Sequence, residues 1–379
     1  GVVSFLGREG ALVVRRRTMI GAAAGLALAA TLLAVIASPS AAMGGDWIAF
    51  TRDPTGGSAF ESGDEEIHAM RLDGSGLVRL TTNSCVDITP SASPDGRWLA
   101  WVQKCGSAVD ILMAPIVYDE TGQLGIGSVT NVTAAMGYGA ERWPQYSPDG
   151  TRLAFMRKTN GNFDIYRGGF AVSASGVPSV VAPVRVVRLG GTAVEDCCVT
   201  WAPDGSSLVW ASNVNQRQRS FDLFRVSAEA VEVWDATSNV DRSSDGTLDV
   251  QIVTQLTSGR EYEGTPAYDA DGTVLFRCNC PNPDVYRIDP LTGVRSRLTT
   301  YGGLDRTPEG FPSGILYSRD DGRAGSDEIY VAEANGANPR NVTNFPQSDV
   351  NPTWIPPQAE PTPSPTPSAT LEPTATVTV

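Results

Sequence analysis

The sequence predicts an all-β fold, a six-bladed β-propeller closed by a C-terminal strand that completes the first blade. Three observations support this prediction. A Pro-Asp-Gly turn recurs along the chain, and three other short residue patterns recur at nearly constant distances from it. The last repeat also supplies a strand that the first repeat lacks. Units of roughly forty to fifty residues that each contain four short strands are typical of propeller blades.

The clearest copy of the turn is Ser147-Pro148-Asp149-Gly150, which lies between two β-rich runs. Pro presets one backbone torsion, Asp bonds to its own main chain, and Gly accepts a positive φ, so the turn should join two strands in a hairpin. The other copies are Ser93–Gly96, Ala202–Gly205, Asp269–Gly272, the degenerate Phe311–Gly314, and Trp354–Pro357, which starts no second strand. The strand after the turn is apolar on both faces, as expected between two neighbouring blades.

An acidic residue precedes each turn and a Pro follows it three positions later, except in the fourth copy, where Val199 replaces the Pro. The six acids are Asp87, Glu141, Asp196, Glu263, Asp305 and Asp349. Each second strand is followed by an acid–aliphatic–aromatic trio such as Asp164-Ile165-Tyr166, and each fourth strand ends in Leu-Thr or a similar pair. The first repeat begins at its second strand, Trp47–Thr51, and Asp349–Trp354 is a first strand without a repeat. Joining them closes the ring and removes an exposed sheet edge.

These repeats resemble the TolB-like six-bladed propeller family, which is built from PD40 (WD40-like) repeats with a Pro-x-aromatic-Ser-Pro-Asp-Gly turn. The resemblance covers residues 46–357 and implies the propeller fold, whereas a fold alone leaves the function open. The chain departs from the pattern in its sixth turn, and at Ala92 and Gly310, where other copies carry an aromatic residue.

Three segments are expected: a signal peptide or N-terminal anchor with its upstream segment at 1–43, the propeller at 44–357, and a disordered Pro/Thr/Ser-rich tail at 358–379. Arg15-Arg16-Arg17 precedes the apolar run Thr18–Ala37, and small residues for signal peptidase follow it. Arg16-Arg17 also resembles a twin-arginine export signal. The alternative is an uncleaved anchor, since the run is long enough to span a bilayer. Either way, the propeller is expected to be exported and to lie in the periplasm, outside the cell or at its surface.

The net charge of −13 disfavours nucleic acid and anionic membrane surfaces as partners. We therefore expect a monomer with no membrane contact beyond the possible N-terminal anchor. The longest insertion, Ala228–Val250, should be a rim loop of the fourth blade, either simply solvated or carrying a variable function.

The six repeat carboxylates, called the acidic ring below, should encircle one mouth of the central channel. Like charges around a narrow opening focus a negative potential, which would suit a cation or a basic segment of a protein partner. The alternative is structural, with each carboxylate capping backbone amides or bonding to the neighbouring blade. A divalent cation needs several converging oxygens, which a wide ring does not guarantee. We therefore predict no cofactor, with a divalent cation at the acidic ring as the alternative.

The six cysteines should be oxidised in an exported protein. Cys85 and Cys105 flank the turn at Gly96 at nearly equal distances, so they should face each other across a hairpin and form a disulfide. The remaining four are Cys197, Cys198, Cys278 and Cys280, in adjacent blades. Their pairing is open between an inter-blade bridge, a vicinal bond and a four-thiolate metal site, although neither spacing matches a zinc ligand pair.

The sequence contains few residue patterns that are typical of catalytic sites. His68 is the only histidine, and its position holds Tyr, Phe or Leu in other repeats, so we interpret it as a packing residue. A Ser-His-Asp hydrolase is not predicted, because no Gly-x-Ser-x-Gly elbow occurs. The predicted function is a non-enzymatic scaffold that binds an unidentified protein partner at one propeller face. The alternative is a glycan-directed enzyme or carbohydrate binder that uses a carboxylate pair and aromatics such as Trp143 and Trp234.

Overall fold

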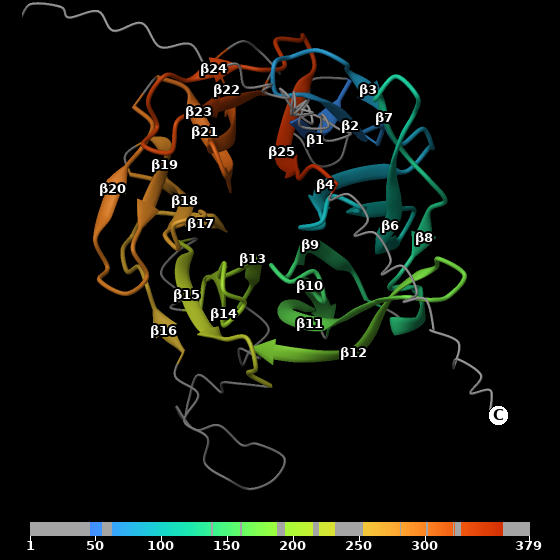
Figure 1. Cartoon of the computed structure of the whole chain (residues 1–379). Helices are drawn as coiled ribbons and strands as arrows, with labels where there is room; N and C mark the ends of the chain where they lie inside the picture. The colour runs from blue at the N-terminus through green and yellow to red at the C-terminus, as the bar shows by residue number, and fades with distance from the viewer. Residues whose placement is uncertain are drawn as a thin grey trace, which may run out of the picture. The chain divides into compact units, whose positions relative to one another are not determined.

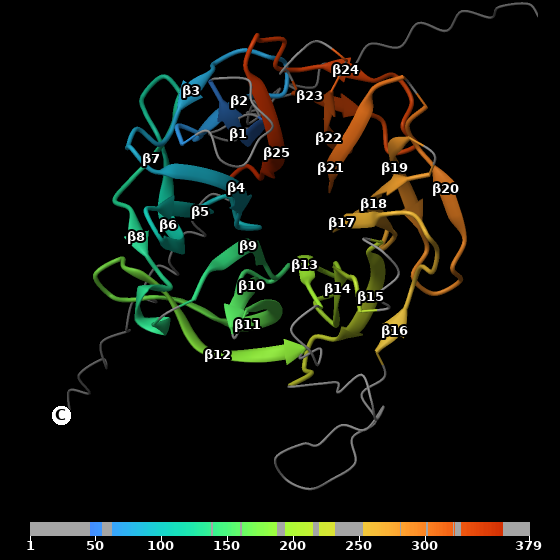
Figure 2. The ribbon, with the colours of Figure 1, turned by 180° about the vertical axis from the view of Figure 1, so that it is seen from behind.

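Six antiparallel sheets surround a central axis in the computed structural model of the chain (Figures 1 and 2). The structure describes residues 46–54, 63–137, 139–159, 161–187, 194–214, 220–231, 253–280, 282–300, 302–320, 322 and 327–358. The predicted signal segment, most of the 228–250 insertion with Trp234, and the tail after 358 lie outside these residues. Their boundaries therefore stay predictions. Within the described ranges, no helix has the length and apolar character needed to cross a membrane.

Each sheet is one blade, whose strands are named in order from the innermost outward. Blade one contains β25 (Ser348–Ile355), β1 (Trp47–Asp53), β2 (Glu66–Arg71) and β3 (Val78–Arg79). Blade two contains β4 (Val86–Ala92), β5 (Trp98–Cys105), β6 (Ala108–Tyr118) and β7 (Leu124–Ile126), with β8 (Thr130–Asn131) also paired to β6. A short 3-10 helix, η1 (Ala134–Met136), leads into blade three, which contains β9 (Glu141–Tyr146), β10 (Arg152–Thr159), β11 (Asn162–Val172) and β12 (Pro178–Val187).

The last three blades repeat this arrangement. Blade four contains β13 (Asp196–Trp201), β14 (Ser207–Ser212), β15 (Asp222–Ser227) and β16 (Thr254–Gln255). Blade five contains β17 (Glu263–Tyr268), β18 (Val274–Asn279), β19 (Pro283–Ile288) and β20 (Arg295–Arg297). Blade six contains β21 (Leu304–Phe311), β22 (Gly314–Asp320), β23 (Asp327–Ala332) and β24 (Arg340–Asn341).

Blade one joins the two ends of the propeller, as predicted. Strand β25 pairs antiparallel with β1, so that Trp47 lies opposite Ile355 and Arg52 opposite Asp349. The strand that completes this sheet therefore comes from the far end of the chain, and it pairs with the inner edge of β1 (Figure 1). The predicted fold class, a six-bladed propeller closed by its C-terminal strand, is confirmed.

The turns form where the Pro-Asp-Gly pattern predicts them. At the third-blade turn, the Gly150 amide donates to the Ser147 carbonyl at 2.8 Å and Gly150 has a φ of 68°. The carboxylate of Asp149 accepts the amide of Thr151 at 3.1 Å, so the Asp side chain closes the turn on its own backbone. The degenerate sixth turn is still a hairpin, with Phe311 directly opposite Gly314.

The core lies between neighbouring blades. Phe155 and Leu153 of blade three, for example, pack in one buried cluster with Ile111 and Met113 of blade two. Burying each such side chain stabilises the fold by about 1.5–3 kcal/mol. The second strand of each blade contacts neighbours on both faces, which explains its apolar sequence.

The Leu-Thr or similar pair that ends each fourth strand has a direct structural cause. In five blades the Thr hydroxyl accepts the backbone amide of the aliphatic residue in the acid–aliphatic–aromatic trio. The pairs are Thr81 with Ile67, Thr133 with Ile111, Thr257 with Leu223, Thr299 with Val285 and Thr343 with Ile329, at 2.9–3.0 Å. The fourth strand is only two or three residues long in most blades, so this hydroxyl continues the pairing of the outer edge.

Candidate binding site at the central channel

Every innermost strand contains a β-bulge two residues after its acidic-ring carboxylate. The residue at this position is never Gly, yet its φ is positive in all six blades. The residues and angles are Thr89 (51°), Trp143 (56°), Cys198 (63°), Thr265 (48°), Thr307 (43°) and Asn351 (53°). Such a conformation costs about 1–3 kcal/mol for a non-glycine residue, so the surrounding fold must impose it.

Bonds between blades help to impose the bulge. The amide of Thr89 donates to the Thr51 hydroxyl of blade one at 3.0 Å. The amide of Asn351 likewise donates to the Ser318 hydroxyl of blade six at 3.2 Å. A bulge bends its strand and re-aims the neighbouring side chains. Here the bulges turn backbone amides toward the adjacent blade.

A channel cavity of about 300 Å³ is lined by the innermost strands from the bulge onward to the turn. Five prolines of the repeat contribute to its wall: Pro90, Pro144, Pro266, Pro308 and Pro352. The aromatic part of the wall comes from Trp143, Tyr146, Trp201, Tyr268 and Trp354. A concave, mainly apolar wall with a few polar groups is the usual composition of a ligand site.

The polar groups of the channel cavity are incompletely satisfied. The Thr89 hydroxyl, both side-chain polar atoms of Asn351 and the Trp354 indole Nε1 are buried without a hydrogen-bond partner among the described residues. An unsatisfied buried polar atom costs about 1–3 kcal/mol. A ligand could bond to these atoms after a small shift of the wall side chains and would then recover part of that cost.

Among the residues that the structure describes, Glu309 is the one carboxylate that lines the channel cavity. Its Oε1 accepts the Trp354 amide at 2.7 Å and the Thr353 hydroxyl at 3.1 Å. Burial raises the pKa of Glu309 to about 7, and these two hydrogen bonds oppose the shift. Sequence reasoning missed this residue, although the signal was present, since Glu309 is the only acid in the position after the repeat Pro.

The acidic ring lies at the starts of the innermost strands, before the bulges, and its members do not contribute to the channel cavity. All six carboxylates are at most 2% exposed. Arginines neutralise four of them, in the pairs Glu141–Arg157, Glu263–Arg295, Asp305–Arg319 and Asp349–Arg52, at 2.6–3.0 Å. The other two accept indole N–H groups, in the pairs Asp87–Trp101 and Asp196–Trp210, at 3.0–3.1 Å. A cation bound here would have to compete with the arginines that pair with four of these carboxylates.

Burial raises the pKa of five acidic-ring carboxylates, those of Asp87, Glu141, Asp196, Glu263 and Asp349. It raises the pKa of Glu141 to about 7 against the opposing charge of Arg157, and it raises the pKa of Asp196 to about 8. A neighbouring carboxylate also raises each pKa. Asp110 acts in this way on Glu141, and Asp164 acts on Asp196. These two ring members thus interact with a trio acid of the preceding blade rather than with each other.

The structure places the cysteines in three pairs. Cys85 and Cys105 continue the register of the β4–β5 hairpin and are joined there, with Cα atoms 4.8 Å apart. Cys197 is joined to Cys198 on β13, and Cys278 to Cys280 at the end of β18. Of the pairings left open by the sequence, the inter-blade bridge is therefore not the one in this structure.

His68 is half-buried and stacks on Phe50 with ring centroids 6.2 Å apart. Burial lowers its pKa to about 4, with Arg52 and Arg79 acting in the same direction. The ring is therefore neutral at physiological pH and acts in packing, as its repeat position predicts.

No family model matches the sequence, and no curated protein matches it either. Solved structures show the same fold. TolB from Acinetobacter baumannii is 20% identical over 82% of this chain and 67% of its own, with a TM-score of 0.56. A putative TolB from Agrobacterium tumefaciens is 16% identical over 82% of this chain and 98% of its own, with a TM-score of 0.53. A chain of hydrazine synthase from Kuenenia stuttgartiensis is 15% identical over 82% of this chain and 46% of its own, with a TM-score of 0.55.

The chain is thus a six-bladed propeller that resembles the TolB-like propellers in fold. At these identities the likeness extends to architecture alone, and the same architecture occurs in a protein named as an enzyme.

Proposed function

We propose that the chain is an exported binding module whose channel cavity has no catalytic role and receives an extended segment of a protein partner. The observation that carries this proposal is the channel cavity itself, in which an apolar wall surrounds buried polar atoms that lack partners. An extended peptide offers both apolar side chains for such a wall and backbone N–H and C=O groups for the polar atoms. The propeller acts as a monomer, and its three cysteine pairs support export to an oxidising compartment.

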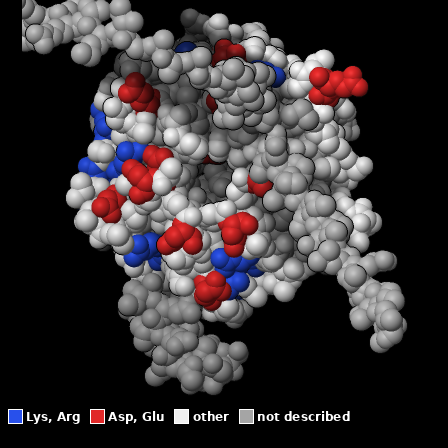
Figure 3. All heavy atoms as spheres, viewed as in Figure 1, with Lys and Arg blue, Asp and Glu red and all other residues white. Residues whose placement is uncertain are grey.

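The negative charge of the channel cavity and of the whole chain favours a basic partner segment. Glu309 is the acidic side chain of the channel cavity, and the net charge of the chain is −13. One face of the propeller is hollowed at its centre, with Asp and Glu side chains interspersed with Lys and Arg on the surface around the hollow (Figure 3). A basic group on the partner, either Lys or Arg, would pair with Glu309 and be attracted over a longer range by the net negative charge of the chain.

We assign the acidic ring a structural role within this proposal. Its carboxylates are buried, and each is paired with an arginine or an indole N–H inside its own blade. Oxygens of Glu141, Asp196 and Glu263 nevertheless lack a hydrogen bond among the described residues, as do polar atoms of the channel cavity. A divalent cation at the acidic ring would have to compete with four arginines.

The test uses the full chain and short synthetic peptides with one Lys or Arg among apolar residues, compared with peptides that carry Gln instead. Binding is followed by fluorescence anisotropy. We expect the basic peptides to bind and Glu309→Gln to weaken them about tenfold, the effect of losing one charge-assisted hydrogen bond of about 1.4 kcal/mol. Glu261→Gln, at an exposed glutamate outside the cavity wall, is the matched control. Equal binding of basic and neutral peptides by all three proteins would refute the proposed role of Glu309.

A second candidate, a carbohydrate binder, is favoured by the tryptophans Trp143, Trp201 and Trp354 in the cavity wall. Aromatic faces can stack against sugar rings, whose hydroxyls would meet the side chain of Asn351. Titration of the same chain with neutral oligosaccharides distinguishes the two candidates. Saturable quenching of Trp fluorescence by a sugar, lost in Trp143→Ala and accompanied by no peptide binding, would select the carbohydrate binder.

A further inference from the structure

Blade five departs from the other blades at the position opposite its acidic-ring carboxylate. In the paired register of the first two strands, this position holds Arg52, Arg157 or Arg319 in three blades and Gln103 or Ser212 in two. In blade five it holds Cys278, which lies directly opposite Glu263. A thiol side chain thus replaces the polar or charged partner that the fold uses elsewhere.

The counter-charge in blade five comes instead from the outermost strand. Arg295 on β20 reaches inward so that its Nη2 lies 2.6 Å from Glu263 Oε1. The same nitrogen lies 3.8 Å from the Sγ of Cys278 and 3.9 Å from the Sγ of Cys280. The rings of Phe276 and Tyr286 hold the guanidinium, with centroids 5.5 and 5.9 Å from its central carbon. A cation fixed beside two sulfur atoms stabilises their thiolate forms.

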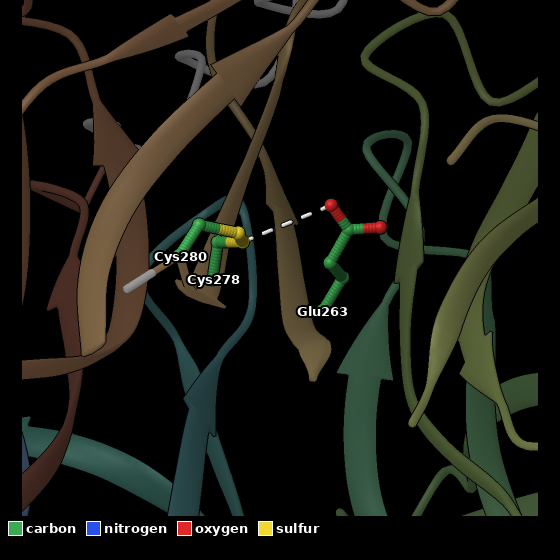
Figure 4. A group of neighbouring side chains, drawn as sticks. All are labelled: Glu263, Cys278 and Cys280. Atoms are coloured by element: carbon green, nitrogen blue, oxygen red, sulfur yellow. Dashed lines mark hydrogen bonds between the residues drawn. A yellow bond between two sulfur atoms is a disulfide. The ribbon is translucent and has the colours of Figure 1, made fainter. Parts of the chain in front are cut away.

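The two cysteines of this pair differ in their exposure to solvent. Cys278 is fully buried, and its Sγ lies 3.7 Å from Glu263 Oε1 (Figure 4). Cys280 is partly exposed and follows the strand, where the Tyr286 hydroxyl donates to its carbonyl at 2.9 Å. Burial raises the pKa of the Glu263 carboxyl, opposed by Arg295, so this group holds a proton to higher pH than an ordinary glutamate. Access for attack and stabilisation of the leaving thiolate are two of the factors that set the rate of thiol–disulfide exchange.

We propose that Glu263, Cys278, Cys280 and Arg295 form a thiol–disulfide exchange site, called the blade-five cysteine site, which oxidises a dithiol of an exported client. The first client thiolate attacks Cys280 Sγ, the Cys278–Cys280 bond breaks, and Cys278 leaves as a thiolate beside Arg295. The second client thiolate then attacks the client sulfur of the mixed disulfide. The client disulfide forms, and Cys280 leaves as a thiolate beside Arg295. Two electrons pass from the client dithiol to the protein pair.

A metal ion is the competing use of these side chains, since Glu263, Cys278 and Cys280 could ligate one through atoms within 4.8 Å of one another. Arg295 argues against it, because its guanidinium contacts all three ligand atoms and would repel a cation. The same positive charge favours the exchange site, because stabilising the reduced thiolate makes a disulfide a stronger oxidant.

The first experiment uses the unmodified full chain. It is equilibrated over a range of reduced-to-oxidised dithiothreitol ratios, quenched with a maleimide and analysed by peptide mass spectrometry. We expect Cys278 and Cys280 to become labelled together, at a ratio at least about tenfold lower than Cys85 and Cys105 require, which is a potential about 30 mV higher. Reduction of both pairs at the same ratio, or a native linkage of Cys278 to any other cysteine, would overturn the proposal.

The second experiment assigns the roles of the two sulfurs and the arginine. Cys278→Ser should form a mixed disulfide with glutathione disulfide rapidly through Cys280, and Cys280→Ser should react at least about tenfold more slowly through the buried Cys278. Arg295→Met should raise the pH at which Cys280 is alkylated. Arg297→Met is the matched control, because Arg297 lies on the same strand and pairs with Asp284 at 2.7 Å. Equal rates for the two Ser variants, or tight Zn²⁺ binding by the reduced chain without any exchange, would overturn the exchange site.

Discussion

The ion pair between Arg52 and Asp349 provides a quantitative test of the structural role given to the acidic ring. It joins β1 to β25 across the closure of the propeller, with two hydrogen bonds of 2.7 and 2.8 Å. The side chains are 8% and 0% exposed, and the guanidinium also lies 4.3 Å from the centroid of the Phe345 ring. Asp349→Asn removes the negative charge with almost no change of shape and leaves Arg52 buried and charged.

Breaking one side of a buried ion pair costs about 3–5 kcal/mol. With a urea m-value of about 3 kcal/mol/M, the unfolding midpoint should fall by roughly 1–1.7 M. Replacing both partners, in Arg52→Met with Asp349→Asn, should cost less than the sum of the two single substitutions, because no uncompensated charge remains. Urea titrations followed by Trp fluorescence measure all four proteins.

Unfolding of Asp349→Asn at the same urea concentration as the native chain would refute a stabilising role for this ion pair. Additive effects of the two substitutions would refute it as well. If Asp349→Asn kept the native urea-unfolding midpoint but lost partner binding, the acidic ring would instead be a binding site.

Three further predictions concern titration and the turns. Because Glu309 has a pKa of about 7, it gains its negative charge as pH rises through 7, so binding of a basic peptide should strengthen between pH 6 and 8 in the native chain and stay flat in Glu309→Gln. The folded-state pKa of Asp196, about 8, lies above its unfolded value, so its stabilising contribution is complete below pH 4 and is lost as pH rises through 8. Urea titrations at pH 6 and pH 9 should therefore show Asp196→Asn gaining stability relative to the native chain at the higher pH. Gly96→Ala should destabilise more than Gly272→Ala, since both have a positive φ, but only at Gly96 would the new Cβ lie 2.0 Å from a backbone oxygen, that of Pro356. The second substitution should cost about 1 kcal/mol in thermal or urea unfolding, and equal losses at both sites would contradict the close contact between Gly96 and Pro356.

The propeller could be predicted because its determinants are local and repeated. The turn at Ser147–Gly150 and the hydroxyl of Thr81 each act over a few residues or between adjacent strands, so their sequence marks have a fixed phase. The closure of blade one followed from the missing first strand. Each of these features depends on where strands and turns lie along the chain, and the regular spacing of the repeats predicts those places.

The site was harder to predict because it depends on side-chain direction. Thr89 and Trp143 have residue types that disfavour a positive φ, so the bulges that shape the channel cavity leave no trace in local propensity. The burial of the acidic ring was within reach of the sequence, because Asp305 and Arg319 are separated by 14 residues across a predicted hairpin. The pairing of Cys278 depended on a choice among three arrangements that spacing alone does not resolve.

The closure of blade one also imposes an order on biosynthesis. Arg52 and Asp349 are separated by 297 residues, so β1 leaves the ribosome long before its partner β25 exists. At roughly 5–20 residues per second, the inner edge of β1 waits about 15–60 s for that strand. Throughout this time the nascent chain presents unpaired backbone N–H and C=O groups on an apolar strand, which is a template for pairing with another chain. A chaperone that covers this single edge would protect the whole propeller until its final strand is made.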